Sequence, residues 1–334
     1  MEKYRNHMIY FTDPIIDNKQ FGIKYNDAEG NSRKTAESIY KALGEVCSET
    51  TMYEYLYQYT SEVNDKSNDI VFSTRYGHAS ANSKALIPAY CEAHNIPYIG
   101  ADSYTHMICN DKYLSKKYVE EFKLKTAPGV LIRNAFDFNQ IKTIDFLQVP
   151  LVIKPNYGGG SNGISSASLQ YSKEEAIKYI QMLQQYQHMP ILVEEYIPGY
   201  EIEIIVFGDS NRILFMDEVQ ILIKGKDYFT NEIYDLETKK INDDLSEMII
   251  SNHLNKSDKL AIENLFKSFD KVEFMRIDCR IYQNRAYVIE LSPDCYLGKD
   301  GGVYLTFKKR NISFEEMFSL MIKNSLYPDK LLSV

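Results

Sequence analysis

The first third of the chain alternates short apolar runs with amphipathic stretches. After Ser32, apolar residues recur with the spacing of one helix face, and a second helix is predicted over 83–93, interrupted at Pro88. The first helix face consists of Ala36, Ile39, Tyr40 and Leu43. Three apolar runs are typical of buried strands, and they cover 8–11, 69–72 and 96–100. This alternation favours an α/β fold with a parallel sheet and flanking helices.

The pattern changes after about residue 111, and the last third of the chain is richer in strands. Helices are predicted over 112–122, after a capping box at Ser172, and over 258–269. The polar segment 224–242 has little periodicity and is interpreted as a mobile loop. Strands are predicted at 130–132, 149–153, 191–197, 202–206 and 213–219, followed by a hairpin over 274–291.

Composition narrows the classes of protein. The 334 residues suffice for about two domains of about 150 residues or for three small ones. With 44% hydrophobic and 25% charged residues, the composition excludes disorder, collagen and coiled coil for the whole chain. A net charge of −8 without a long basic run argues against nucleic-acid binding. Neither a membrane helix nor a signal peptide is predicted. The five scattered cysteines are expected to be reduced thiols of a cytoplasmic protein.

The predicted hairpin places charged side chains on one face. Strict alternation in the first strand puts Arg276, Asp278 and Arg280 on one side. A three-residue loop is expected to pair Tyr282 with Ala286, which sets Asp278 opposite Glu290. In this register one face of the second strand carries Val288, Glu290 and Ser292. A two-residue loop would put the two carboxylates on opposite faces.

Two carboxylates that face each other in a sheet need a cation beside them. One candidate is Mg²⁺, which binds through one or two carboxylates together with substrate phosphates. The other is a network in which Arg276 and Arg280 neutralise both acids. The hairpin alone leaves both alternatives open.

Two further segments are typical of phosphate and nucleotide binding. Lys154 ends a buried strand and precedes four glycines in 158–163, whose N–H groups can surround an anion. The spacing fits neither a P-loop nor a dinucleotide motif, so a simple glycine-rich turn stays an alternative. The segment 191–201 is an extended stretch that can bind an adenine edge, with a carboxylate nearby for a ribose, or it is a solvated strand edge.

Taken in order, these segments resemble the ATP-grasp superfamily, and most closely the D-alanine–D-alanine ligase family. The resemblance covers nearly the whole chain. It rests on 96–100 with Asn110-Asp111-Lys112 and Lys116, on 150–163, on 193–201, and on Arg276-Ile277-Asp278 with Glu290. It implies an N-terminal parallel-sheet domain followed by two α+β domains that clamp ATP. The implied domains cover 1–111, 112–199 and 200–334.

The resemblance also implies roles for individual residues. Lys112, Lys154 and Lys239 resemble the lysines that hold ATP phosphates. The family's adenine-binding segment is matched by Glu194, Glu195, Tyr196 and Ile197. Its ribose-binding carboxylate is matched by Glu201. The loop that closes over the γ-phosphate is matched by Gly159, Gly160 and Ser161. Arg276 matches the arginine that stabilises the transition state, and Asp278 and Glu290 match the magnesium ligands. Glu29 is similar to the glutamate that binds the first substrate's amino group.

This chain departs from the family on the amino-acid side. Ser292 replaces the third metal ligand, an asparagine, and Asp294 is an alternative to it. Gly160 replaces the loop serine and leaves Ser161 beside it, while Lys240 replaces a tyrosine. The turn after Glu290 is also different. The substrates are therefore expected to differ from two D-alanines.

The resemblance implies an ATP- and Mg²⁺-dependent ligase that joins a small carboxylate to an amine through an acyl phosphate. Arg276 would stabilise the tetrahedral oxyanion, with Lys240, Ser161 and Glu29 on the substrate side. A homodimer is implied by the resemblance alone. The alternatives are an ester-forming or kinase-like enzyme and a catalytically silent or regulatory ATP-binding protein, for which Ser292 and the missing loop serine are the argument.

Overall fold

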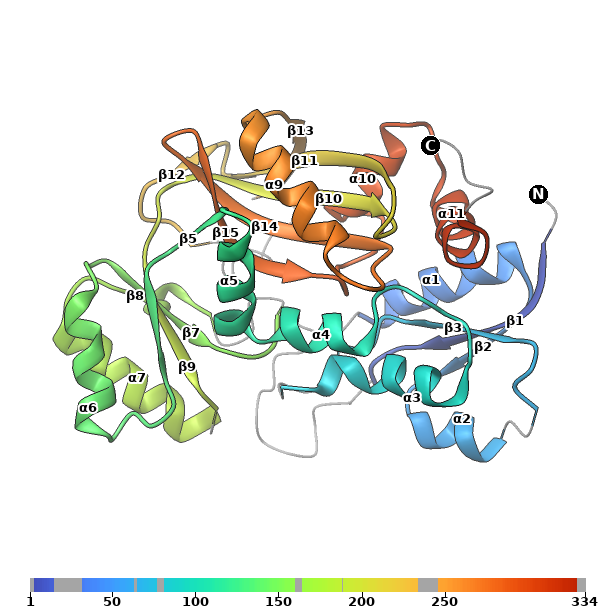
Figure 1. Ribbon diagram of the computed structural model, residues 1–334, viewed down its shortest axis with the longest axis horizontal. Helices are drawn as coiled ribbons and strands as arrows, with labels where there is room; N and C mark the ends of the chain where they lie inside the picture. The colour runs from blue at the N-terminus through green and yellow to red at the C-terminus, as the bar shows by residue number, and fades with distance from the viewer. Residues whose placement is uncertain are drawn as a thin grey trace.

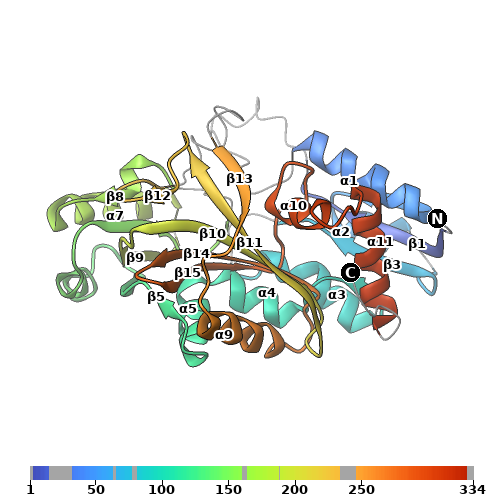
Figure 2. The ribbon, with the colours of Figure 1, turned by 90° about the horizontal axis from the view of Figure 1, so that it is seen from above.

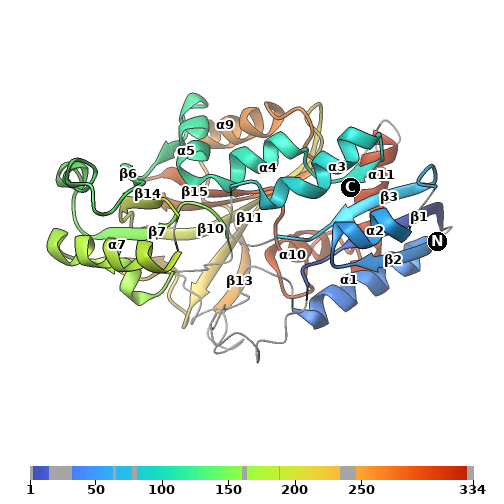
Figure 3. The same ribbon diagram turned by 90° about the horizontal axis from the view of Figure 1, so that it is seen from below.

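The computed structural model describes residues 3–14, 32–62, 65–76, 81–159, 164–187, 189–233 and 246–328. Their strands form three sheets that lie in a row, with the N-terminal sheet on the right of Figure 1 and the largest sheet in the middle. Figure 3 shows the same order from below. Among these residues no helix combines the length and the apolar character needed to cross a membrane.

The N-terminal sheet is parallel throughout, with the strand order β2-β1-β3-β4, which confirms the predicted α/β arrangement. Its edge strand β2 was not predicted, because Ser48, Glu49 and Thr50 interrupt any apolar pattern. The elements of this region are β1 (Tyr4–Phe11), α1 (Arg33–Val46), β2 (Cys47–Tyr53), α2 (Leu56–Glu62), β3 (Asp69–Ser73), η1 (Ser83–Ala85), α3 (Leu86–His94) and β4 (Tyr98–Ile99).

Two helices of this region follow their sequence signals with one correction each. Ser32 caps α1 by accepting a hydrogen bond from Thr35 N–H (3.1 Å). Three of the predicted apolar positions of α1 are buried, but Tyr40 is 37% exposed. Pro88 does not interrupt α3: it lies in the first turn of the helix, where its missing N–H has no intrahelical acceptor to lose.

The second sheet is antiparallel, with the order β6-β9-β7-β8. Strand β9 ends at Glu195, two residues before the predicted end. Helix α7 packs Ala176, Ile180 and Leu183 against this sheet. The elements are α4 (Ser103–Asn110), α5 (Lys112–Glu121), β5 (Lys125–Thr126), β6 (Gly129–Ile132), α6 (Phe138–Ile141), η2 (Lys142–Phe146), β7 (Leu151–Pro155), η3 (Ser166–Ser168), β8 (Leu169–Gln170), α7 (Lys173–Gln187) and β9 (Ile191–Glu195).

The largest sheet has the order β13-β11-β10-β14-β15-β5, with β12 paired to β10. Its strands are antiparallel except for the pairing of β15 with β5. Strand β13 was not predicted, and β12 lies inside the segment expected to be a mobile loop, of which 234–242 is outside the described residues. The elements are β10 (Gly199–Gly208), β11 (Ile213–Ile223), β12 (Tyr228–Phe229), β13 (Ser246–Ser251), α9 (Lys256–Lys267), β14 (Phe274–Tyr282), β15 (Arg285–Ser292), α10 (Gly302–Lys308) and α11 (Phe314–Leu326).

The two faces of the largest sheet have different neighbours. One face packs on α4, α5 and α9 through residues such as Ile204, Ile277 and Ile262. The other face is covered at one end by α10 and α11, which share a core with the N-terminal sheet; Figure 2 shows α11 beside α1. The rest of this second face carries polar side chains, which line a pocket. The five cysteines are all buried and free.

Candidate active site

A deep pocket separates the second sheet from the uncovered part of the largest sheet. Strands β7 and β9 and the segment after β9 form one wall, and β10, β14 and β15 form the other. The space between them measures about 1030 Å³, its opening to solvent included. A pocket between two sheets, lined by both apolar and charged side chains, is a usual place for a small-molecule site.

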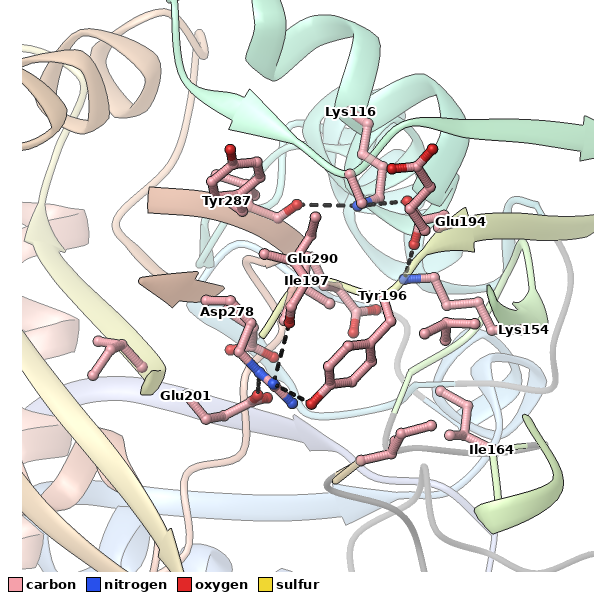
Figure 4. A pocket seen from close by; sticks show the side chains of 18 of the residues that line it. Lys116, Lys154, Ile164, Glu194, Tyr196, Ile197, Glu201, Asp278, Tyr287 and Glu290 are labelled. Carbon is pink, nitrogen blue, oxygen red and sulfur yellow. Dashed lines mark hydrogen bonds and ion pairs between the residues drawn. The ribbon is translucent and has the colours of Figure 1, made fainter. Parts of the chain in front are cut away.

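A buried carboxylate flanked by two lysines lies in the first wall. Glu194 forms ion pairs with Lys116 (Nζ–Oε1 2.7 Å) and Lys154 (Nζ–Oε2 2.6 Å), as Figure 4 shows. Burial opposes the charged form of Glu194, but the two lysines outweigh it and hold the pKa of Glu194 below its usual range. Burial lowers the pKa of Lys116 to about 8, against the attraction of Glu194. The cluster carries one net positive charge when both lysines are protonated.

The segment after β9 is joined to the opposite wall through Arg280. The guanidinium pairs with Glu201 and donates hydrogen bonds to the Tyr196 hydroxyl (3.0 Å) and the Ile197 carbonyl (3.3 Å). The Tyr196 hydroxyl in turn donates to the Glu232 carbonyl (2.9 Å). Arg280 therefore fixes the position of the segment that follows β9 relative to the largest sheet.

Arg276 lies farther along the same wall, between two carboxylates. Its Nε and Nη2 donate to Asp278 Oδ1 (2.7 Å) and Oδ2 (2.9 Å), and its Nη1 lies 3.5 Å from Glu203 Oε1. Burial raises the pKa of Asp278 to about 7; Glu203 and Glu290 act in the same direction and Arg276 opposes them. This wall therefore has more acidic than basic groups.

Asp278 and Glu290 lie opposite each other, as predicted, but the loop that was expected to achieve this is wrong. The hairpin turn has two residues, Gln283 and Asn284, both with positive φ (49° and 60°), and it pairs Tyr282 with Arg285. A β-bulge between Asp278 and Cys279 then adds one residue to β15 and shifts the register by one.

The bulge also changes which side chains face the pocket. Val288 and Leu291 both belong to the core, so the predicted grouping of Val288 with Glu290 is wrong. Ile289 and Glu290 are consecutive, and both line the pocket, as do Tyr287 and Val288 before them. The bulge thus turns Glu290 toward Asp278 despite the short turn.

Lys112 lies beside Glu290. Its Nζ is 3.4 Å from Glu290 Oε1 and also donates to the Gly158 carbonyl. Burial opposes the charged form of Glu290, but the cations around it, Lys112 first, hold the pKa of Glu290 below its usual range. The start of the glycine-rich segment is held from the same side, because Gly158 N–H donates to Asn110 Oδ1 (3.2 Å).

The remaining predicted residues divide into two groups. Glu195 accepts a hydrogen bond from Gln148 N–H (2.9 Å), and Ser292 is buried opposite Arg276. Asp294 is outside this pocket and pairs with Lys84 (2.8 Å). Gly159 is described, whereas five predicted residues lie outside the described residues: Glu29, Gly160, Ser161, Lys239 and Lys240.

Three charged residues of the pocket were not predicted as site residues from the sequence. Glu203 follows Glu201 by two residues on β10, so the two side chains lie on the same face of the strand. This spacing could have identified Glu203 as a pocket residue. Arg280 was placed on the correct face but only as a neutralising charge. Lys116 is one helical turn after Lys112 on α5, and no local signal distinguishes the two lysines.

The donor set in the second wall fits a magnesium ion that binds together with phosphate. Asp278 and Glu290 supply two facing carboxylates, which is the usual protein contribution to Mg²⁺ sites with phosphate ligands. Within the described part of the chain, no group of three or more His, Cys, Asp or Glu side chains is arranged to hold a metal ion by itself.

Comparison with known proteins gives consistent results. A family model described as D-ala D-ala ligase C-terminus matches residues 120–322. The chain is 25% identical to a D-alanine–D-alanine ligase of Clostridium beijerinckii, over 79% of this chain and 84% of that one. It is 23% identical to the enzyme of the same name from Thermotoga maritima, over 88% of this chain and 92% of that one.

Two solved structures have the same fold. One is a D-alanine–D-alanine ligase from Bacillus anthracis complexed with ATP (TM-score 0.71, 19% identity, 97% of this chain and 98% of that one). The other is the VanG D-Ala:D-Ser ligase from Enterococcus faecalis (TM-score 0.70, 15% identity, 97% of this chain and 100% of that one). Because the family match extends over more than half of the sequence, the chain belongs to the D-alanine–D-alanine ligase family of ATP-grasp carbon–nitrogen ligases.

Proposed function

We propose that this protein joins a small carboxylate to an amine at the expense of ATP, through an acyl phosphate, and that its substrates are not two D-alanines. The observation that carries the proposal is the pocket between the two sheets. It combines a lysine pair around Glu194 on one wall with Arg276, Asp278 and Glu290 on the other. Phosphoryl transfer needs this combination of fixed cations and metal-binding carboxylates.

ATP would lie along the pocket, with its purine at the segment after β9. The N–H of Ile197 has no hydrogen-bond partner within the described ranges, so it is available to a purine edge. Glu201 would accept hydrogen bonds from the ribose hydroxyls. Lys116 and Lys154 would contact the phosphates, and Lys112 would join them from the side of Glu290.

Mg²⁺ would be held by Asp278 and Glu290, with the Ser292 hydroxyl as a weaker neighbour at the end of β15. When bound, it would neutralise phosphate charge and so favour phosphoryl transfer. The site residues proposed here follow from their chemistry and from the family to which the chain belongs.

The reaction proceeds in two steps. An oxygen of the substrate carboxylate attacks the γ-phosphorus of ATP, ADP leaves, and an acyl phosphate forms. The amine then attacks the acyl carbon, phosphate leaves, and the amine loses a proton. Arg276 would stabilise the negative oxygen of the tetrahedral intermediate, because it is the cation at the end of the phosphate region nearest to Ser292.

The unusual residues beyond Ser292 support a substrate other than D-alanine. Asp294 forms a buried ion pair with Lys84 at the carboxyl ends of β3 and β4, where ligands of parallel sheets usually bind. A site built around such polar groups discriminates against substrates that leave them unpaired, by up to about 10⁴-fold.

The test is phosphate release from Mg·ATP in the presence of D-alanine alone, of other amino acids including acidic ones, and of larger amines paired with carboxylates. Turnover with such a pair and little with D-alanine alone is expected. Robust turnover with D-alanine alone would contradict the proposed substrate difference. Nucleotide binding without turnover for any pair would favour the catalytically silent alternative. We also propose a homodimer, on the resemblance alone, which light scattering on the purified protein tests.

A further inference from the structure

Arg276 has two acidic partners, and only one of them belongs to the proposed metal site. Its bidentate contact with Asp278 occupies both carboxylate oxygens, at 2.7 and 2.9 Å. Its third nitrogen, Nη1, lies 3.5 Å from Glu203 Oε1. The first contact has the geometry of a full bidentate pair, whereas the second is at most a loose ion pair.

The bidentate contact competes with the proposed role of Asp278. One guanidinium uses one lone pair on each carboxylate oxygen, and a magnesium ion would bind the remaining lone pairs of the same single negative charge. We therefore expect Arg276 to hold Asp278 less tightly when metal and nucleotide bind, because the metal draws on the charge that holds the guanidinium. A buried guanidinium that loses its partner needs another acceptor, since an unpaired buried charge is strongly unfavourable.

We propose that Glu203 is a positioning residue that takes over Arg276 when Asp278 turns to the metal and nucleotide. This inference rests on the proposed function. Glu203 faces Asp278 across the β10–β14 pairing and is buried on the same side of the sheet, so a small rotation of Arg276 reaches it. The movement also carries the guanidinium away from Asp278 without taking it out of the site.

The surroundings of Glu203 keep its carboxylate directed toward Arg276. Its other oxygen, Oε2, lies so close to Gly302 that a Cβ at that position would collide with it. Gly302 is the first residue of α10, and Val219 Cγ1 lies 3.4 Å from the same point. Glu203 is thus enclosed on the side away from the arginine, and even a single methyl group at Gly302 would push its carboxylate out of place.

The experiment measures the affinity of ADP by calorimetry, once with Mg²⁺ and once with EDTA. The ratio of the two affinities reports how readily Asp278 accepts the metal. In Glu203→Gln the ratio is expected to fall about tenfold, because a charge-assisted contact for the released arginine is lost. The affinity for ADP in EDTA is expected to stay within about twofold of the wild type. An unchanged ratio would overturn the proposal.

A control separates this effect from the loss of a buried carboxylate as such. Glu218 on the neighbouring strand is equally buried and pairs with Lys259 (3.3 Å) away from the pocket. Glu218→Gln is expected to lower stability but to leave the ratio of affinities unchanged. A similar fall of the ratio in both variants would contradict a specific role for Glu203.

A double-mutant cycle separates positioning from simple attraction between Glu203 and the metal. If Glu203 acts through Arg276, then Glu203→Gln changes the ratio in the wild type but not in an Arg276→Gln background. An equal effect in both backgrounds would show that the charge of Glu203 acts on the metal directly and would overturn the proposal. Gly302→Ala, which keeps the charge but displaces the carboxylate, is expected to lower the ratio as well, with Gly44→Ala, where the new Cβ meets open space, as its control.

The wild type separates the failure of this inference from that of the proposed function. If ADP does not bind, or binds without any gain from Mg²⁺, the proposed nucleotide site and the role of Glu203 both fall. If the gain is present and Glu203→Gln leaves it intact, only the role of Glu203 falls.

Discussion

The two ends of the β14–β15 hairpin lie at pockets that differ in size and in charge. Toward the turn, the pocket of about 1030 Å³ exposes Arg280, Asp278 and Glu290 to a large open space. At the other end, beyond Arg276 and Ser292, a second space of about 410 Å³, its opening to solvent included, is lined by Phe274 and by the buried pair of Lys84 and Asp294. The first end is larger and rich in charges, and the second is smaller and contains the paired charges of Lys84 and Asp294 together with Arg75.

On the proposed function, this difference separates the two tasks of a ligase. The wide end has both cations and carboxylates, which a nucleotide with its metal would require. At the narrow end Lys84 comes from the N-terminal region and Asp294 follows β15 by two residues, so the ion pair joins two parts of the molecule. We expect substitutions at the wide end to affect phosphoryl transfer and those at the narrow end to affect stability and substrate choice.

The largest effect is expected at the wide end, from Lys154→Ala. Lys154 is proposed to bind phosphate, so removing its charge should reduce turnover at least about 10³-fold, equivalent to roughly 4 kcal/mol. The fold should survive, because Glu194 keeps Lys116 as a partner. Phosphate release and thermal melting measure the two properties. The exposed Lys178 of α7 gives the control Lys178→Ala, which should change neither. Undiminished turnover in Lys154→Ala would show that the segment after Lys154 is only a turn.

The next effect is expected at the narrow end. Asp294→Asn removes the carboxylate that pairs with the buried Lys84, whose side chain is only 8% exposed, and should destabilise the fold by about 3 kcal/mol. Urea denaturation measures this loss. The affinity for ADP should stay unchanged, because the pair lies outside the wide pocket.

The double variant Lys84→Met with Asp294→Asn sharpens this test. If the two charges are coupled, the double variant should lose clearly less stability than the sum of the single variants. Additive losses would show that the pair contributes no interaction of its own. A large change in the affinity for ADP would contradict the separation of the two ends.

The contrast between these ends was only partly predictable from the sequence. Asp278 and Glu290 were correctly predicted to face each other, but the three-residue loop on which that prediction rested is wrong. The turn has only two residues, and the bulge at Ile289 restores the missing one. Nothing in the local sequence indicates the bulge, which depends on packing Val288 and Leu291 into one core. Strand β2 was not predicted because it is a polar edge strand, whereas the strictly alternating β14 was predicted in full.

Contacts between distant segments could not be derived from spacing. Lys112 and Lys116 lie one turn apart on α5, and only the position of β9 decides that Lys116 pairs with Glu194. The domain boundaries at 111 and 199 remain a proposal. They separate the three sheets except for β5, while α10 and α11 share a core with the N-terminal sheet.

A smaller effect is expected from pH at the wide end. The pKa of Lys116 is about 8 in the folded protein, below the value of about 10.4 for an unperturbed lysine. Above pH 8 the folded state therefore binds fewer protons than the unfolded state, and stability should rise with pH toward 10. The affinity for ADP should fall over the same range, because Lys116 loses its charge. Urea denaturation and calorimetry at several pH values measure the two trends.

The variant Lys116→Gln tests whether Lys116 causes these opposite trends of stability and ADP affinity with pH. The variant should bind ADP more weakly than the wild type at pH 7 and lose the decline above pH 8. Lys117→Gln, at an exposed lysine paired with Glu120 on the same helix, should keep it. Parallel changes of stability and affinity with pH would contradict the assignment of the titration to Lys116.

The smallest effect is expected at the turn of the hairpin, from the double substitution Gln283→Asn with Asn284→Gly. Both positions have positive φ, for which Asn-Gly is the preferred pair in a two-residue turn, so the variant should gain about 0.5–1 kcal/mol in urea denaturation. The contact of Asn255 with the carbonyl of residue 284 (2.6 Å) involves only the backbone there and is kept. Because the bulge at Ile289 sets the register of Asp278 and Glu290, the Mg²⁺-dependent affinity for ADP should stay unchanged. A change in that affinity would mean that the turn, and not the bulge, holds the two carboxylates in line, since the substituted side chains themselves are exposed and far along the strands from the pair.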